Sequence, residues 1–166
     1  SVGDPTGNNA MGPVVSKDQY DSVQSYIQKG IDEGAQLVAG GTGRPDGLDK
    51  GYYVKPTVFV TDNNSTIARE EIFGPVLVMI GYDDYDDAIA IANDTEFGLA
   101  GHIVGQDTAE ASKLARRIRA GAIYINGGFD FHAPFGGYKK SGNGREWGEH
   151  GFTEYLEVKS IIGGEG

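Results

Sequence analysis

The 166-residue sequence contains no cysteine. It can therefore form no disulfide bond, and it offers no thiolate as a nucleophile or a metal ligand. Its three histidines, at positions 102, 132 and 150, do not have the spacing of metal ligands, so we expect no metal site. No run of about eighteen apolar residues is present, which excludes an ordinary membrane-spanning helix.

Basic residues are scarce: 14 lysines and arginines face 24 acidic residues, and the net charge is −10. A nucleic-acid-binding protein needs basic patches that neutralise phosphates, so we expect no nucleic-acid partner. The same charge disfavours anionic membrane surfaces, and we expect no membrane partner. No signal peptide is visible, and we expect a cytoplasmic location.

The apolar pattern predicts strands alternating with helices. Such alternation is typical of βαβ units, so we predict an α/β fold with a mostly parallel sheet. The predicted helices begin at the N-caps Ser16, Asp84 and Asp107, and the last of them ends near Gly121. The predicted strands cover residues 37–39, part of 52–60, 76–80, 99–104 and 122–125.

The segment Arg69–Pro75 combines two glutamates, a phenylalanine and a Gly-Pro stop just before the apolar run 76–80. Glu71 and Phe73 would then stand on a tight connection at the mouth of a buried strand. A carboxylate there can accept hydrogen bonds from two sugar hydroxyls, and an aromatic ring can pack on a flat ring. Taken alone, these residue types favour a plainer interpretation, a solvated acidic turn and a core phenylalanine.

A second distinctive stretch, residues 133–146, interleaves glycines with Phe135 and Tyr138. Loops that are both glycine-rich and aromatic often approach a ligand, although residue types alone slightly favour a plain surface loop. We expect Lys139 and Arg145 to fix this loop through ion pairs. Trp147 and Phe152 are expected to be packing residues, and Asn126 is expected at the carboxyl end of a strand, where sites of parallel sheets lie.

Both stretches resemble signatures of the NAD(P)-dependent aldehyde dehydrogenase superfamily, EEIFGP and PFGGYKxSGxGRE. The resemblance runs from Met11-Gly12-Pro13 to the tail at 155–159. It implies that Glu71 holds the hydroxyls of the nicotinamide ribose and that Phe73 lies against the nicotinamide. Gln19 would fall in the helix that closes over the adenine-side ribose, so we expect it to be a third cofactor-binding residue.

The resemblance also implies that Phe135, and more loosely Phe129 and Phe131, line an aldehyde tunnel. Residues 1–13 are rich in glycine, asparagine and proline and have no periodicity, so we expect a loop or linker there. The resemblance makes 14–151 the C-terminal portion of a catalytic domain and 152–166 a tail. The tail would carry a strand, around 155–162, that joins subunits, so we expect a homo-oligomer, a dimer or a tetramer. Residues 154–158 alternate in polarity as a half-buried strand does.

In this family a cysteine thiolate attacks the aldehyde, hydride passes to NAD or NADP, and a glutamate assists hydrolysis. The resemblance places all these groups, with the dinucleotide-binding domain, before Ser1. We therefore expect this chain to be the C-terminal part of a dehydrogenase and to contain no catalytic residue. Its partner would be the rest of the same polypeptide, and the isolated chain would have no activity. Two alternatives stay open: a stand-alone interaction or oligomerisation module derived from the enzyme, and a lone nucleotide-binding domain.

Overall fold

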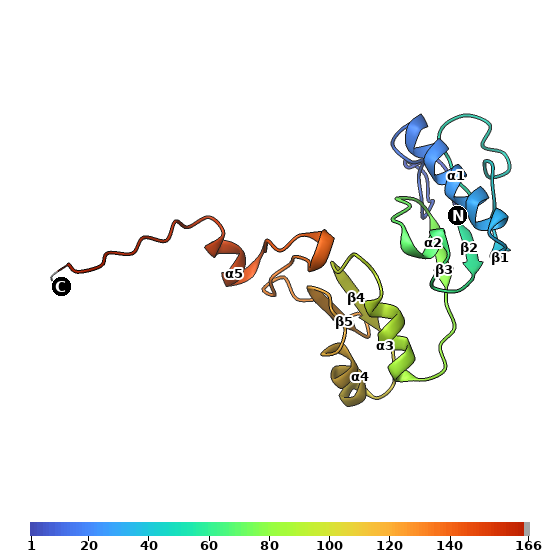
Figure 1. Cartoon of the computed structure of the whole chain (residues 1–166). Coiled ribbons are helices and arrows are strands. Elements are labelled where there is room, and N and C mark those ends of the chain that lie inside the picture. Colours follow the sequence, from blue (N-terminus) through green and yellow to red (C-terminus); the bar gives the residue numbers. More distant parts are fainter. Residues whose placement is uncertain (165–166) are drawn as a thin grey trace. The chain divides into compact units, whose positions relative to one another are not determined.

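The computed structural model describes residues 1–164 (Figure 1). The chain divides into two compact units, Ser1–Tyr82 and Asp83–Gly166. Each unit contains one small β-sheet with helices, and two of the three strand pairings are parallel. The prediction of an α/β fold with mostly parallel pairing is therefore confirmed. Across residues 1–164, no helix has the length and apolar character needed to span a membrane.

The first unit contains two helices and a three-stranded sheet of order β1-β2-β3. Its elements are α1 (Lys17–Asp32), β1 (Gln36–Ala39), β2 (Thr57–Val60), α2 (Thr66–Arg69) and β3 (Val76–Met79). Strand β2 pairs antiparallel with β1 and parallel with β3. The short helix α2 therefore serves as the crossover between two parallel strands.

Helix α1 begins where its N-cap predicts. The hydroxyl of Ser16 accepts a hydrogen bond from the backbone N–H of Gln19 at 3.2 Å. Such a bond satisfies one of the amide groups that have no partner within the helix. The helix then presents a stripe of apolar residues to the sheet, as its periodicity predicts.

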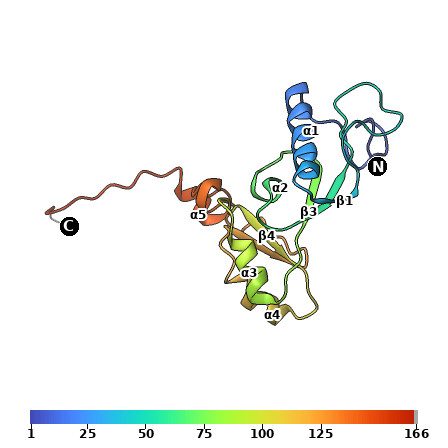
Figure 2. The same ribbon diagram turned by 45° about the vertical axis from the view of Figure 1, so that its right-hand side comes forward.

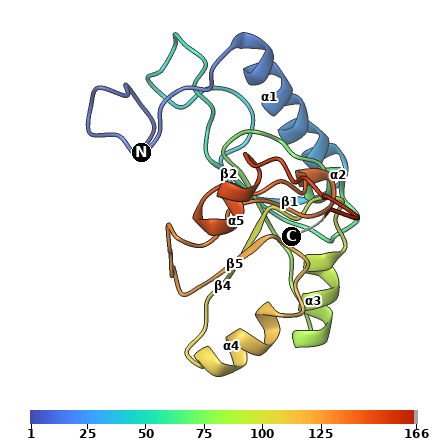
Figure 3. The same ribbon diagram turned by 90° about the vertical axis from the view of Figure 1, so that its left-hand side faces the viewer.

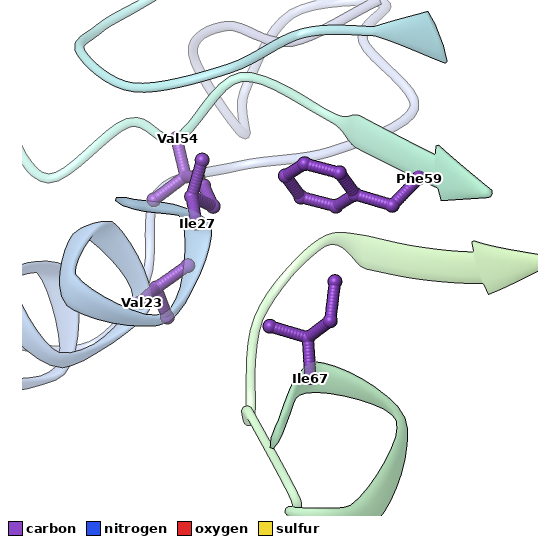
Figure 4. Close-up of a cluster of buried hydrophobic side chains, with 5 residues drawn as sticks. All are labelled: Val23, Ile27, Val54, Phe59 and Ile67. Carbon is purple, nitrogen blue, oxygen red and sulfur yellow. The ribbon is translucent and has the colours of Figure 1, made fainter. Parts of the chain in front are cut away.

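The core of the first unit forms where both helices meet the sheet. Val23 and Ile27 of α1 and Ile67 of α2 converge on Phe59 of β2, with Val54 beside them (Figure 4). All five side chains are buried. Burial of a side chain of this size stabilises a fold by roughly 1.5–3 kcal/mol. The core therefore fixes α1 against the strands that flank the segment 70–75.

The second unit is a βαβ unit with an additional helix before it (Figures 2 and 3). Strands β4 (Ala100–Ile103) and β5 (Ala122–Ile125) are parallel and are connected through α4 (Thr108–Ala115). The preceding helix is α3 (Tyr85–Asn93). Asp84 and Asp107 cap α3 and α4 by accepting backbone hydrogen bonds, as predicted.

Several local predictions differ from the structure. Helix α4 ends at Ala115, ahead of Gly121, because turn-type bonds follow it: Arg117 N–H donates to Leu114 O and Ile118 N–H to Ala115 O. The short helices η1 (Lys139–Ser141) and α5 (Gly148–Thr153) were not predicted.

The tail, for which a subunit-joining strand is predicted, has no strand partner within residues 1–164. Residues 154–162 belong to no strand, and Tyr155 and Val158 are 82% and 95% exposed (Figure 1). A β-strand needs a neighbouring strand to satisfy its amide and carbonyl groups, and none of the described strands pairs with this segment.

Candidate functional site

The connection between α2 and β3 turns one side chain inward and two outward. Ile72 packs against the core of the first unit. Glu71 and Phe73 are both exposed, and the ring of Phe73 is 69% accessible. Phe73 is therefore not a core residue, contrary to the plainer interpretation of its sequence. Within residues 1–164, the Glu71 carboxylate has no hydrogen-bond or ion-pair partner, so its oxygens are free to accept bonds from a ligand.

The backbone at Phe73 has a left-handed conformation, with φ of 54°. Positive φ values are disfavoured for residues other than glycine, so contacts with neighbouring residues must hold Phe73 in this conformation. The side-chain amide of Gln19 donates a hydrogen bond to the carbonyl oxygen of Phe73. Its carbonyl oxygen, Oε1, lies 3.4 Å from the backbone N of Val15 and accepts from it. The structure thus places Gln19 next to the predicted cofactor residues.

Contacts with α1 also fix Gly74 and Glu70, near the two ends of the connection. A Cβ atom at position 74 would lie 2.5 Å from Cγ2 of Val23, so only glycine fits against α1 there. At the other end, the hydroxyl of Tyr26 donates to Oε2 of Glu70 at 2.7 Å. This hydrogen bond, with lesser help from desolvation, raises the pKa of Tyr26 above its ordinary value. Glu70 therefore has a structural contact, which leaves Glu71 as the available carboxylate.

The second unit gathers the three predicted tunnel phenylalanines around one tryptophan. The ring centroids of Phe129, Phe131 and Phe135 lie 6.2, 5.9 and 5.1 Å from that of Trp147. Phe129 and Phe131 also meet edge to face at 4.7 Å. Aromatic pairs at such separations attract one another beyond simple burial. Trp147 packs against all three rings, and its place at the centre of this cluster was not predicted.

Phe129, Phe135 and Trp147 line a cavity of about 470 Å³, whereas Phe131 packs against Phe129 and Trp147 without lining it. Its other walls come from β5 and from the segment that follows it, including Tyr124, Ile125, Gly128 and Pro134. Tyr124 stacks on Phe129 with centroids 6.0 Å apart and on His102, its partner across the strand pair, at 5.0 Å. Tyr124 is a lining residue that the sequence analysis missed. Its position beside the carboxyl end of a parallel strand was the available signal.

The glycine-rich loop is fixed by two cations, as expected, but by a different kind of bond. Nη1 of Arg145 donates to the carbonyl oxygens of residues 137, 143 and 144 at 2.9–3.0 Å. Nζ of Lys139 donates to the carbonyl oxygens of residues 93 and 95. Within residues 1–164 neither side chain pairs with a carboxylate, so the prediction of ion pairs is wrong: Arg145 bonds carbonyls of its own loop, and Lys139 bonds carbonyls at the end of α3. Phe135 is fixed by a bridge in which its N and O each bond Glu146 at 2.7 Å.

Asn126 lies at the carboxyl end of β5, as predicted, but its side chain is engaged in the fold. Its Oδ1 accepts from the N–H of Gly105, and its Nδ2 donates to the carbonyl oxygen of Gly105, both at 2.9 Å. Gly105 follows β4, so this amide ties together the ends of the two parallel strands. Asn126 therefore supports the segment that carries Phe129 and Phe131.

Comparison with known proteins gives a consistent match. The profile described as "Aldehyde dehydrogenase family" matches residues 1–161. A "Putative aldehyde dehydrogenase" of Staphylococcus aureus is 56% identical over 165 residues, which cover 98% of this chain and 35% of that protein. The chain thus spans about a third of the length of this curated relative.

Solved structures agree. A mutant of an aldehyde dehydrogenase from Pseudomonas syringae, in complex with NAD+ and octanal, is 54% identical with a TM-score of 0.94; the match covers 98% of this chain and 34% of that one. A Mycobacterium tuberculosis aldehyde dehydrogenase in complex with NAD+ is 49% identical with a TM-score of 0.90, covering 99% of this chain and 35% of that one.

Proposed function

The chain belongs to the aldehyde dehydrogenase family, and from this premise we propose that it is the C-terminal part of an enzyme that oxidises an aldehyde to a carboxylic acid with NAD or NADP. In this proposal the chain supplies one wall of the cofactor site and one wall of the aldehyde tunnel. The cysteine nucleophile, the glutamate base and the dinucleotide-binding domain belong to the rest of the polypeptide. The isolated chain is therefore inactive.

The observation that carries the proposal is the outward pair on the 70–75 connection. Glu71 offers a carboxylate without a partner among the described residues, and Phe73 beside it offers a ring that is 69% exposed. These groups fit the nicotinamide end of the cofactor, since a carboxylate can accept bonds from two ribose hydroxyls and a ring can pack on a flat ring. When bound, the nicotinamide accepts the hydride that leaves the aldehyde carbon.

The aromatic cluster of the second unit supports the substrate part of the proposal. Phe129 and Phe135 line a cavity with Trp147 and Tyr124, and Phe131 packs against Phe129 beside it. A lining rich in aromatic rings suits a small organic aldehyde. In the intact enzyme, the exposed apolar tail around 155–162 pairs with another subunit, which gives a homo-oligomer.

Kinetics of the intact enzyme test the cofactor wall. We expect Glu71→Gln to lower kcat/KM for the cofactor by about tenfold or more, because one charge-assisted acceptor is lost. Phe73→Ala should also lower it. Asp49→Asn, which removes an exposed carboxylate elsewhere in the first unit, is the matched control. If Glu71→Gln and Phe73→Ala both behave like Asp49→Asn, the cofactor wall is rejected.

The native protein tests the alternative of a stand-alone module. Its intact mass and N-terminal sequence, read from the source organism, give the residues that precede Ser1. A preceding segment with a cysteine and a dinucleotide-binding domain supports the proposal. A mature protein that starts at Ser1, and that assembles without oxidising aldehydes, favours the oligomerisation module.

A further inference from the structure

Helix α1 contacts the 70–74 segment at three successive positions. Gln19 bonds the carbonyl oxygen of Phe73, Val23 packs against Gly74, and Tyr26 bonds Glu70. Residues spaced by four and then three lie on one face of an α-helix. One face of α1 therefore holds the backbone of the segment, while Glu71 and Phe73 turn their side chains away from the core.

The polar atoms of Gln19 are both used within the first unit. Its Nε2 donates to Phe73 and its Oε1 accepts from Val15. These two bonds fix the position of the amide, and each atom keeps one further hydrogen-bonding site. The bond to Phe73 reaches a residue whose backbone is left-handed, with φ of 54°. Because the backbone angles of a residue set the direction of its Cα–Cβ bond, a contact that holds the carbonyl of Phe73 also sets where its ring points.

We propose that Gln19 is a positioning residue, which orients the ring of Phe73 for the nicotinamide through the carbonyl oxygen of Phe73. This inference rests on the proposed function. This role acts through Phe73 and is separate from the position over the adenine-side ribose that the family resemblance implies for Gln19. It also gives α1 a role in the reaction, since α1 carries the group that holds the aromatic wall in place.

The test uses the intact enzyme and four variants: Gln19→Met, Phe73→Ala, the double variant and Gln28→Met. Methionine has a similar length but cannot donate the bond. Gln28→Met is the matched control, because Gln28 lies on the same helix and its Nε2 donates to Asp32 at 2.8 Å, away from the 70–74 segment. For each variant, kcat/KM for the cofactor and the thermal unfolding midpoint are measured.

We expect Gln19→Met to lower kcat/KM by about five- to tenfold, the size of one lost hydrogen bond, and Gln28→Met to leave it unchanged. In the Phe73→Ala background the effect of Gln19→Met should vanish, because no ring remains to be oriented. A purely structural role would persist there, since the carbonyl of residue 73 is still present. The unfolding midpoints of Gln19→Met and Gln28→Met should fall by similar amounts.

Three results would overturn the inference. An equal loss from Gln19→Met in both backgrounds would indicate a direct cofactor contact or a general structural role. A Gln19→Met enzyme with unchanged kcat/KM, when Glu71→Gln is impaired, would remove Gln19 from the mechanism but leave the proposed function intact. A loss in Gln28→Met equal to that in Gln19→Met would show that the kinetic change follows from helix stability alone. By contrast, unchanged kcat/KM in Glu71→Gln and Phe73→Ala would reject the proposed function itself.

Discussion

The carboxylate of Glu33 accepts two hydrogen bonds from Thr66, one from its backbone N–H at 2.9 Å and one from its hydroxyl at 2.6 Å. Thr66 is the first residue of α2, and its N-cap, Ser65, makes no side-chain capping bond. Glu33, at the C-terminal end of α1, therefore caps α2 from another helix. The bonds, led by the one from the Thr66 hydroxyl, hold the pKa of Glu33 below its ordinary value of 4.5.

This contact makes a pH-dependent contribution to stability. A carboxylate whose pKa is lowered by folding stabilises the folded state above its unfolded pKa, and the contribution is lost as the pH falls through the lower folded pKa. We expect Glu33→Gln to be less stable than the wild type at pH 7. The difference should shrink at pH values below about 4.5.

Urea unfolding of both proteins across this pH range measures the effect, with Asp49→Asn as the control for loss of a carboxylate. A stability difference that stays constant as the pH falls would show that the charge of Glu33 is not involved.

Helix beginnings could be predicted from the sequence because capping is local. Ser16, Asp84 and Asp107 each bond an amide within three residues, so the pattern contains its own partner. The end of α4 could not be predicted in the same way. The apolar spacing continues to Ile118, but the chain leaves the helix after Ala115 through tighter turns. The tail strand could not be judged either, because pairing depends on a neighbour that alternating polarity does not identify.

The candidate site was predictable in residue types but not in contacts. The motifs identified Glu71, Phe73 and Phe135, yet the bond between Gln19 and Phe73 joins residues 54 positions apart. Nothing in the local pattern at 73 indicates a left-handed backbone, since phenylalanine is rarely found there. Likewise, the sequence shows the charge of Arg145 but not that its partners are backbone carbonyls.

The left-handed backbone at Phe73 predicts that a glycine variant is more stable than an alanine variant at this position. Alanine and glycine both remove the ring, but alanine keeps the Cβ atom that makes a positive φ unfavourable by about 1 kcal/mol. We therefore expect Phe73→Gly to be more stable than Phe73→Ala by about 1 kcal/mol. At Ser22, an exposed position within α1, the order should reverse, because glycine is the poorer helix former.

Denaturant unfolding of these four variants checks the order. If alanine is more stable than glycine at both positions, then the backbone at 73 is not left-handed in solution.

Gly121 should tolerate no side chain. A Cβ atom at this position would lie 1.6 Å from the carbonyl oxygen of Gly136, so the start of β5 and the glycine-rich loop would have to move apart. We expect Gly121→Ala to lower the free energy of unfolding by about 3 kcal/mol, near the upper end for overpacked sites. Gly144→Ala is the control, because nothing lies within 4 Å of its Cβ position. Equal stabilities of the two variants would contradict this close approach.

At Asn126, the loss of hydrogen bonds to Gly105 and the strain of a left-handed backbone can be measured separately. The side chain of Asn126 makes two bonds at 2.9 Å, and its backbone has a φ of 51°, which asparagine tolerates better than most residues. We expect Asn126→Ala to lose about 2 kcal/mol, since both bonds disappear and alanine is strained there. Asn126→Gly loses the bonds without the strain and should be more stable than Asn126→Ala. Asn126→Asp keeps the acceptor but cannot donate to the Gly105 carbonyl.

Urea unfolding of the three variants measures these steps, and Gln106→Ala, at an exposed neighbouring amide, should stay within about 0.5 kcal/mol of the wild type. Tryptophan fluorescence adds a second measurement, because Trp147 is the only tryptophan and contacts the rings of Phe129 and Phe131. If Asn126 supports the segment that carries these rings, its loss should change the Trp147 emission before the protein unfolds. An unchanged stability and emission in Asn126→Ala would show that the ends of β4 and β5 are held together without this amide.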